Sequence, residues 1–391
     1  DGEINEVIDT LKSGWITTGP KTKELERRLS EFTNTPKTVC LNSATAALEL
    51  TLRVLGIGKG DEVIVPAMTY TASCSVIYHV GAKAVIVDIA EDSHEMDYDA
   101  LANAITENTK AVIPVDLAGI PCDYDKIFEV VESKKHLFKA NSEYQEKLGR
   151  VAVVADGAHA LGSTYKGKEI GSVADFTTFS FHAVKNFTTA EGGSVTWKQN
   201  ENFDNEELYR EYQIYSLHGQ TKDALAKTKA GSWEYDIVIP GYKCNLTDIA
   251  ASIGLVQLDR YPKLLERRED IISHYNKGFE GTRIKALSHS SDDYKSCGHL
   301  YITHVEGATF EQRGEIIVKM AERGISCNVH YKPLPLLTAY KNLGFDIENY
   351  PNAYNYYVKE ITLPLHTRLS DEDVAVIIEN FKEIVEEVVG E

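Results

Sequence analysis

The chain has 391 residues, of which 43% are hydrophobic and 26% charged, and its formal net charge at pH 7 is −18. This composition supplies a large core and excludes the disordered and fibrous classes, and the length predicts two or three structural units. The acidic excess repels polyanions, so we expect neither nucleic acid nor an anionic membrane surface as a partner. Any anionic ligand must therefore be bound by local groups.

The six cysteines lie apart along the chain, without a C-x-x-C pair. The sequence therefore predicts neither a disulfide framework nor a metal site. No apolar run approaches the roughly 20 residues that a membrane-spanning helix needs. The start of the chain has neither the basic nor the apolar region of a signal peptide. We therefore expect a cytoplasmic protein.

From about residue 37 to 200, short β-branched runs alternate with helical stretches, such as those at 44–55 and 72–80. This alternation predicts βαβ units in an α/β fold, a three-layer αβα sandwich with a mostly parallel central sheet. Ligands of such a sheet bind at the carboxyl ends of its strands. The runs typical of buried strands are 38–41, 62–66, 84–88, 111–114 and 151–155.

A charged segment at 129–150 interrupts the alternation, and we expect it to be a solvated excursion. From about residue 260 the pattern changes to that of a smaller α+β unit. We therefore predict a large domain of residues 1–259 and a small C-terminal domain of residues 260–391. The elements predicted for the small domain are a helix at 264–279, a strand at 299–305, a helix at 310–323, a strand at 325–331 and a helix at 371–388.

Asp156 closes an apolar run, and Ser180 and Lys185 precede a segment rich in Thr and Gly. Singly, these residues are typical of turns, loops and surfaces. Together they fit the chemistry of pyridoxal phosphate (PLP), in which a carboxylate keeps the pyridine nitrogen protonated and a lysine amine forms a Schiff base.

The stretch 42–48 joins a strand end to a helix start, where backbone amides can hold a phosphate, although an ordinary helix cap has the same composition. Tyr70 follows the next strand and is either a core aromatic or, as its position favours, a ring that stacks on the cofactor.

Ordered motifs along nearly the whole chain resemble the DegT/StrS-type sugar aminotransferases, which are fold-type I PLP enzymes acting on nucleotide-linked keto-sugars. The resemblance implies that Lys185 forms the Schiff base and moves the proton between substrate and cofactor, and that Asp156 pairs with the pyridine nitrogen. The motifs lie at 14–20, 43–48, 66–70, 156–162, 180–193, 217–219, 241–258, 329–334 and 363–366. The other cofactor-binding residues that it implies are Ala44, Thr45, Tyr70, His159, Ser180 and Asn245.

Members of this family are usually homodimers with shared active sites, so segment 241–245 would reach the partner's site. Many members have Gly-Tyr-Asn-Tyr-Arg where this chain has Gly-Tyr-Lys-Cys-Asn, so both Asn245 and Lys243 are candidates for the phosphate contact across the interface. The substrate-binding residues that the resemblance implies are Trp15, Thr18, His218, His330 and Tyr331.

The resemblance predicts transfer of an amino group from glutamate or glutamine, through the pyridoxamine form (PMP) of the cofactor, to a nucleotide-linked sugar of the 4-keto-6-deoxy type. The product would serve the synthesis of a surface polysaccharide or another glycan. The alternatives are amination of a keto-cyclitol, another PLP reaction on the same scaffold, and a non-catalytic PLP-binding sensor. Lys185 argues against the related dehydratases, which have histidine there, and the intact Asp156 and Ser180 disfavour the sensor.

Overall fold

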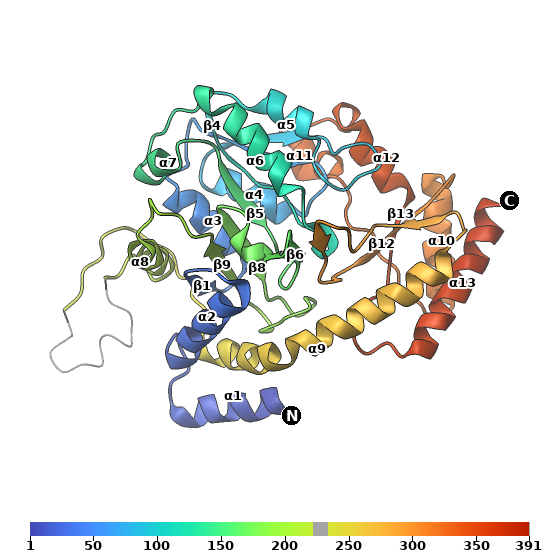
Figure 1. The fold of residues 1–391 in the computed structure, drawn as a ribbon, viewed down its shortest axis with the longest axis horizontal. Helices are drawn as coiled ribbons and strands as arrows, with labels where there is room; N and C mark the ends of the chain where they lie inside the picture. The colour runs from blue at the N-terminus through green and yellow to red at the C-terminus, as the bar shows by residue number, and fades with distance from the viewer. Residues whose placement is uncertain (222–233, 391) are drawn as a thin grey trace.

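The computed structural model describes residues 1–221 and 234–390, built around a seven-stranded sheet (Figure 1). Six of these strands run in one direction, and β9, between β1 and β8, runs in the opposite direction. Successive side chains of β2 enter opposite cores, Val63 and Val65 on one face and Ile64 on the other, which confirms the predicted three layers. In sheet order the strands are β1 (Thr38–Leu41), β9 (Gly193–Trp197), β8 (Phe176–Ser180), β5 (Ala152–Asp156), β4 (Thr109–Val112), β2 (Glu62–Pro66) and β3 (Lys83–Val87).

Helices cover both faces of this sheet. One core contains apolar residues of α3 (Ala44–Val54), α4 (Thr71–His79) and α8 (Asn205–Ser216). The helices that contribute to the other core are α2 (Pro20–Thr33), α5 (Tyr98–Ala104), α6 (Tyr124–Ser133) and α9 (Asp248–Phe279).

The long helix α9 runs from the large core into the C-terminal part, with α1 (Gly2–Ser13) packed along it (Figure 1). The helix predicted at 264–279 begins earlier, at Asp248, where the Thr247 hydroxyl accepts a hydrogen bond from Ala250 N. Pro262 lies inside the helix, because packing against α1 and α2 outweighs its missing N–H. The predicted boundary between residues 259 and 260 falls within α9 and stays a prediction.

The C-terminal part has its own core, in which Tyr275 and Phe279 of α9 pack against Tyr301 and Phe381 respectively. An antiparallel sheet in the order β10-β12-β13 is packed against helices there, so the helices predicted at 310–323 and 371–388 and the strand at 299–305 are confirmed within two residues. The elements are β10 (Ile284–Ala286), β12 (Tyr301–Val305), α10 (Phe310–Glu322), α12 (Pro351–Lys359), β13 (Glu360–Leu363) and α13 (Asp371–Val389).

The strand predicted at 325–331 is wrong. Only Asn328 forms a bridge there, to Thr362 of β13. Two residues later, His330 N donates to the buried side chain of Glu360 instead of a main-chain carbonyl, at 3.0 Å, so the ladder stops. The segment leads instead to α11 (Thr338–Asn342).

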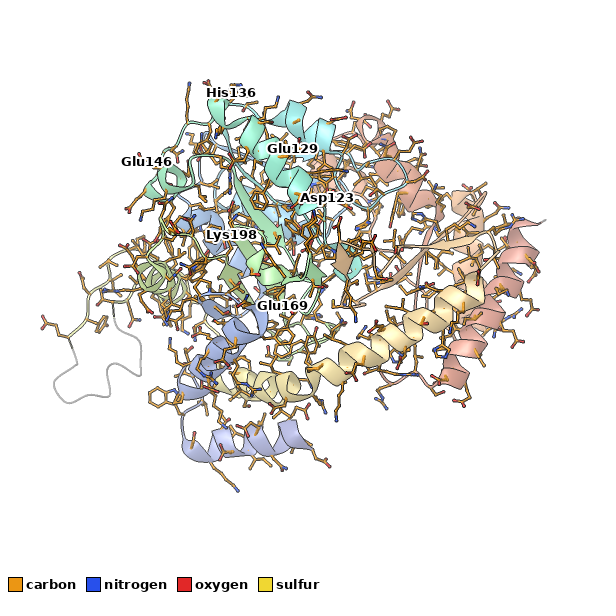
Figure 2. The ribbon with its side chains drawn as sticks, in the orientation of Figure 1. Asp123, Glu129, His136, Glu146, Glu169 and Lys198 are labelled. Atoms are coloured by element: carbon orange, nitrogen blue, oxygen red, sulfur yellow. The ribbon has the colours of Figure 1, made fainter. Side chains whose placement is uncertain are left out.

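The segment 129–150 is only partly the expected solvated excursion. Figure 2 shows Glu129, His136 and Glu146 on its outer side. Its inner side is packed, since Tyr144 of α7 (Glu143–Leu148) is buried and Gln145 Nε2 donates to Leu55 O, at the end of α3.

A small sheet of β11 (Tyr294–Lys295), β6 (Thr164–Tyr165) and β7 (Lys168–Glu169) completes the described strands. Within residues 1–221 and 234–390, no helix is both long and apolar enough to cross a bilayer.

Candidate active site

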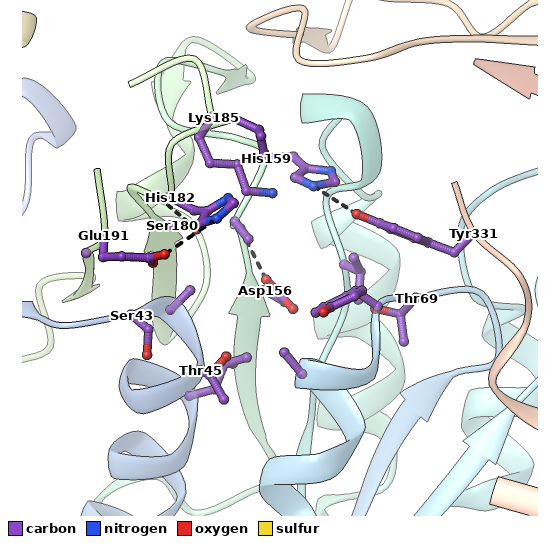
Figure 3. A pocket seen from close by; sticks show the side chains of 18 residues that line it. Ser43, Thr45, Thr69, Asp156, His159, Ser180, His182, Lys185, Glu191 and Tyr331 are labelled. Atoms are coloured by element: carbon purple, nitrogen blue, oxygen red, sulfur yellow. Dashed lines mark hydrogen bonds and ion pairs between the residues drawn. The ribbon is translucent and has the colours of Figure 1, made fainter. Parts of the chain in front are cut away.

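A pocket of about 370 Å³ lies at the carboxyl ends of β5 and β8 and at the start of α3 (Figure 3). Its walls come from strand ends and helix starts, as the sheet architecture predicts. Asp156 is the last residue of β5, Ser180 the last of β8, and Ala44 the first of α3. The pocket brings together these members of the predicted site: Ala44, Thr45, Tyr70, Asp156, His159, Ser180, Lys185 and Tyr331.

Asp156 is buried and fixed by two donors. Ser73 Oγ donates to Oδ2 at 2.6 Å, and Ala158 N donates to Oδ1 at 3.1 Å. Burial raises the pKa of Asp156, while these hydrogen bonds and the nearby Lys185 act in the opposite direction. A buried carboxylate of this kind is stabilised by a positively charged partner placed in the pocket.

Lys185 lies on the loop between β8 and β9, and its side chain reaches over the pocket toward the His159 ring (Figure 3). Desolvation lowers the pKa of Lys185 to about 8, against the opposing effects of Asp156 and Cys297. About a tenth of the amine is therefore unprotonated at pH 7, far more than for an ordinary lysine, and this is the form that attacks a carbonyl.

His159 is buried and neutral, because desolvation, together with the positive charge of Lys185, lowers its pKa well below the usual value. Its Nδ1 accepts the N–H of Ala118 at 3.3 Å, so the ring proton lies on Nε2. Nε2 is 3.3 Å from the hydroxyl of Tyr331, to which it donates. His159 therefore presents a fixed tautomer to the pocket.

The start of α3 provides an anion cradle. The Ser43 hydroxyl accepts from Ala46 N at 3.1 Å, which leaves the amides of Ala44 and Thr45 at the first two helical positions, where the helix offers no internal partner. Gly193 lies against this turn: a Cβ there would be 2.4 Å from Ala44 N and from the carbonyl carbon of Ser43. Glycine thus permits the close approach of β9 to the cradle.

Five predicted residues lie outside this pocket: Trp15, Thr18, His218, Asn245 and His330. Trp15 Nε1 donates to Thr18 O at 3.1 Å, and Asn245 Nδ2 donates to the Thr18 hydroxyl. Lys243 Nζ contacts the Asn245 side chain. His218 is exposed, and its backbone N donates to Tyr242 O at 2.6 Å. The folded chain therefore does not bring Trp15, Thr18, His218 or Asn245 to the pocket wall.

His330 precedes the pocket residue Tyr331 but does not itself line the pocket. Its Nδ1 lies 2.9 Å from Thr362 Oγ1. The ring of Tyr331 lies 5.8 Å from that of Tyr70, so these two aromatic side chains form one wall.

Sequence reasoning missed several pocket residues. His182 and Glu191 line the pocket next to each other, with Nε2 and Oε1 3.6 Å apart. Ser73, whose hydroxyl donates to Asp156, lies three residues after Tyr70 at the start of α4. Because residues three apart on a helix lie on the same face, this spacing could have pointed to Ser73. No signal in the sequence connects Glu191 to His182, because their contact depends on the path of the loop.

The donor set fits PLP on its own chemistry. A buried carboxylate and a lysine amine face one pocket, and free helix-start amides close its other end, where the glycine at position 193 leaves room. These groups match a pyridinium nitrogen, an aldehyde and a phosphate respectively.

Comparison with known proteins agrees. The model of the DegT/DnrJ/EryC1/StrS aminotransferase family matches residues 1–382. The "Putative sugar aminotransferase Spr1654" of Streptococcus pneumoniae, in its PMP form, is 69% identical with a TM-score of 0.97, over 99% of this chain and 97% of that chain. The spore coat polysaccharide biosynthesis protein SpsC of Bacillus subtilis is 38% identical over 98% of this chain and 94% of its own length. PseC of Helicobacter pylori, an aminotransferase involved in pseudoaminic acid biosynthesis, is 29% identical with a TM-score of 0.85, over 99% and 97%.

Spr1654 has been solved in both its PLP and PMP forms. The fold and the site thus define a PLP-dependent aminotransferase. The chain belongs to the DegT/DnrJ/EryC1/StrS aminotransferase family.

Proposed function

We propose that this enzyme transfers an amino group from glutamate or glutamine to the keto group of a nucleotide-linked sugar of the 4-keto-6-deoxy type, for polysaccharide or glycan synthesis. The observation that carries the chemistry is the pairing of Lys185 and Asp156 in one pocket. The sugar substrate is supported by the names of three relatives, a sugar aminotransferase, a polysaccharide biosynthesis protein and a pseudoaminic acid enzyme.

When bound, PLP supplies an aldehyde that condenses with amines and a ring that withdraws electrons from the substrate α-carbon. Asp156 keeps the proton on the ring nitrogen. Lys185 would hold the cofactor, and its Nζ, once released by the amino donor, would accept the proton from the donor α-carbon. In the second half-reaction the same Nζ returns a proton to the carbon that receives the amino group.

The other pocket residues bind and orient the cofactor. The amides of Ala44 and Thr45, with the Ser180 hydroxyl, hold the phosphate. Tyr70 and His159, which both line the pocket, would contact the ring.

We propose a homodimer in which Trp15, Thr18, His218 and Asn245 or Lys243 serve the partner's pocket, while His330 and Tyr331 face the sugar from within the same chain. The position of the first four residues outside their own pocket supports this arrangement. So does an exposed apolar row on α1, where Ile4, Ile8 and Leu11 lie on one face at helical spacing.

The test follows the visible absorption of PLP bound to the purified protein. Glutamate or glutamine should convert it to the PMP spectrum, and a panel of UDP-, dTDP- and GDP-4-keto-6-deoxy sugars should restore it. Lys185→Ala should abolish both changes. A spectrum that no amino donor alters would favour a sensor, and turnover of a keto-cyclitol alone would overturn the nucleotide-sugar proposal.

A further inference from the structure

A buried segment of the C-terminal part, residues 297–299, lies against the loop that carries the catalytic lysine. Cys297 Sγ donates to His159 O at 2.8 Å, and Cys297 N donates to the Ser163 hydroxyl at 2.9 Å. His299 N donates to Ala118 O at 3.0 Å. Cys297 and His299 are only 4% and 6% exposed. This segment therefore forms part of the base of the site, although neither residue lines the pocket.

Asn186, the neighbour of Lys185, is held by this segment at both ends of its amide. Its Nδ2 donates to Cys297 O at 3.0 Å, which leaves Oδ1 facing His299 Nδ1 at 2.9 Å. An amide oxygen only accepts hydrogen bonds, so His299 Nδ1 must carry a proton and donate. Desolvation, together with nearby Lys185, lowers the pKa of His299 well below its usual value, so Nε2 is unprotonated.

Other contacts of the loop that carries Lys185 lie within the loop or reach the large core. On one side of Lys185, Val184 is 68% exposed. Lys185 N donates to His182 O at 2.9 Å within the turn itself, and Phe187 is packed against Phe181, beyond Asn186. Asn186, the neighbour of Lys185, is therefore the residue through which segment 297–299 contacts this loop.

We propose that His299 is a positioning residue for transamination: its Nδ1–H holds Asn186 and thereby keeps Lys185 Nζ in line for proton transfer in both half-reactions. The inference rests on the proposed role of Lys185. It assigns the small unit a part in the chemical step, since a side chain placed just before β12 orients a group on the β8–β9 loop.

Two substitutions of His299 distinguish the loss of its hydrogen bond to Asn186 from the loss of side-chain volume. In His299→Asn, the new Nδ2 is as many bonds from the backbone as Nδ1 of histidine, so it can donate to Asn186. In His299→Gln, the amide reaches the place of Nε2 and leaves Asn186 without its donor. Loss of packing predicts the opposite order, because asparagine is the smaller residue and leaves the larger cavity.

We expect His299→Gln to slow both half-reactions by about 10- to 100-fold in single-turnover spectra, and His299→Asn to stay within about threefold of the wild type. The KM for the amino donor should change little in either. Asn186→Ala removes the amide that accepts the hydrogen bond from His299, so it should slow both half-reactions in the same way. It replaces His299→Gln in the test if that variant does not fold.

A second readout uses the protein without cofactor. Competitive acetylation across a range of pH gives the pH midpoint at which Lys185 becomes reactive. This midpoint should equal the wild-type value in His299→Asn and should be higher in His299→Gln, where the Lys185 amine moves freely into water. If His299→Asn and His299→Gln have equal half-reaction rates and equal acetylation midpoints while the wild type transaminates, the inference about His299 is wrong and the proposed function stands. A wild type that does not react with any donor would instead overturn the proposed function.

Discussion

At the scale of single residues, burial acts on two charges in opposite ways. It raises the pKa of Asp156 and lowers the pKa of Lys185 to about 8, so each group is less charged than it would be in water. A cofactor with a cationic ring nitrogen restores the charge of the carboxylate, and an aldehyde needs the neutral amine. The protonation preferences of Asp156 and Lys185 therefore both suit PLP.

Replacing Asp156 by asparagine should lower the rate of the donor half-reaction by at least about 100-fold, because an amide of the same shape cannot carry the charge that keeps the ring nitrogen protonated. Ser73→Ala is the matched control. It removes one hydrogen bond, worth about 1 kcal/mol, and keeps the carboxylate, so a fall of about tenfold or less is expected. Rates of Asp156→Asn within tenfold of the wild type would contradict the assigned role.

The pKa of Lys185 predicts how cofactor uptake depends on pH. Only the neutral amine attacks an aldehyde, so the rate at which the cofactor-free protein takes up PLP should rise about tenfold per pH unit below pH 8 and level off above it. Stopped-flow absorbance from about pH 6 to about pH 10 measures this. A rate still rising at the top of that range would mean that the amine titrates like an ordinary lysine.

At the scale of elements, the phosphate cradle depends on how closely β9 approaches α3. In Gly193→Ala the new methyl group would meet backbone atoms of Ser43 and Ala44, which cannot rotate away. We expect the dissociation constant for PLP, measured by fluorescence titration, to rise by at least about tenfold. Ser194→Ala is the control, since the described structure gives its buried hydroxyl no hydrogen-bond partner, and its PLP affinity should be unchanged.

Elements whose role depends on local pattern could be predicted from the sequence. Apolar runs identify the strands, and the residues that follow them, such as Asp156 and Ser180, therefore lie at one edge of the sheet. Contacts between distant segments could not be predicted in the same way. The bond between His299 and Asn186 joins residues 113 positions apart, and no periodicity encodes it. The strand predicted at 325–331 failed for the same reason, because a side chain from β13 replaces the ladder.

At the scale of the whole molecule, the proposed sharing of active sites can be tested by mixing two inactive variants. Lys185→Ala disables a chain's own pocket, and Lys243→Ala or Asn245→Ala would disable the partner's. Heterodimers of the two kinds contain one intact site. Random reassociation of equal amounts should therefore restore about a quarter of the wild-type activity.

The same mixture distinguishes the two candidates for the contact across the interface, since only the variant that lacks the true contact should be inactive alone and rescued by mixing. No rescue with either one, with dimers shown by light scattering, would mean that each pocket is completed within its own chain.

The continuous helix α9 has a mechanical consequence. At about 1.5 Å per residue its 32 residues form a rod of about 48 Å, so a tilt of a few degrees displaces its far end by several ångströms. Gly298 O accepts from Arg268 in the far half of this rod, whereas Phe187, two residues after Lys185, packs against Tyr261 near its middle. Bending costs least at Pro262, because one hydrogen bond of the helix is already missing there, and a bend at this point would change how Gly298 sits relative to the loop of Lys185.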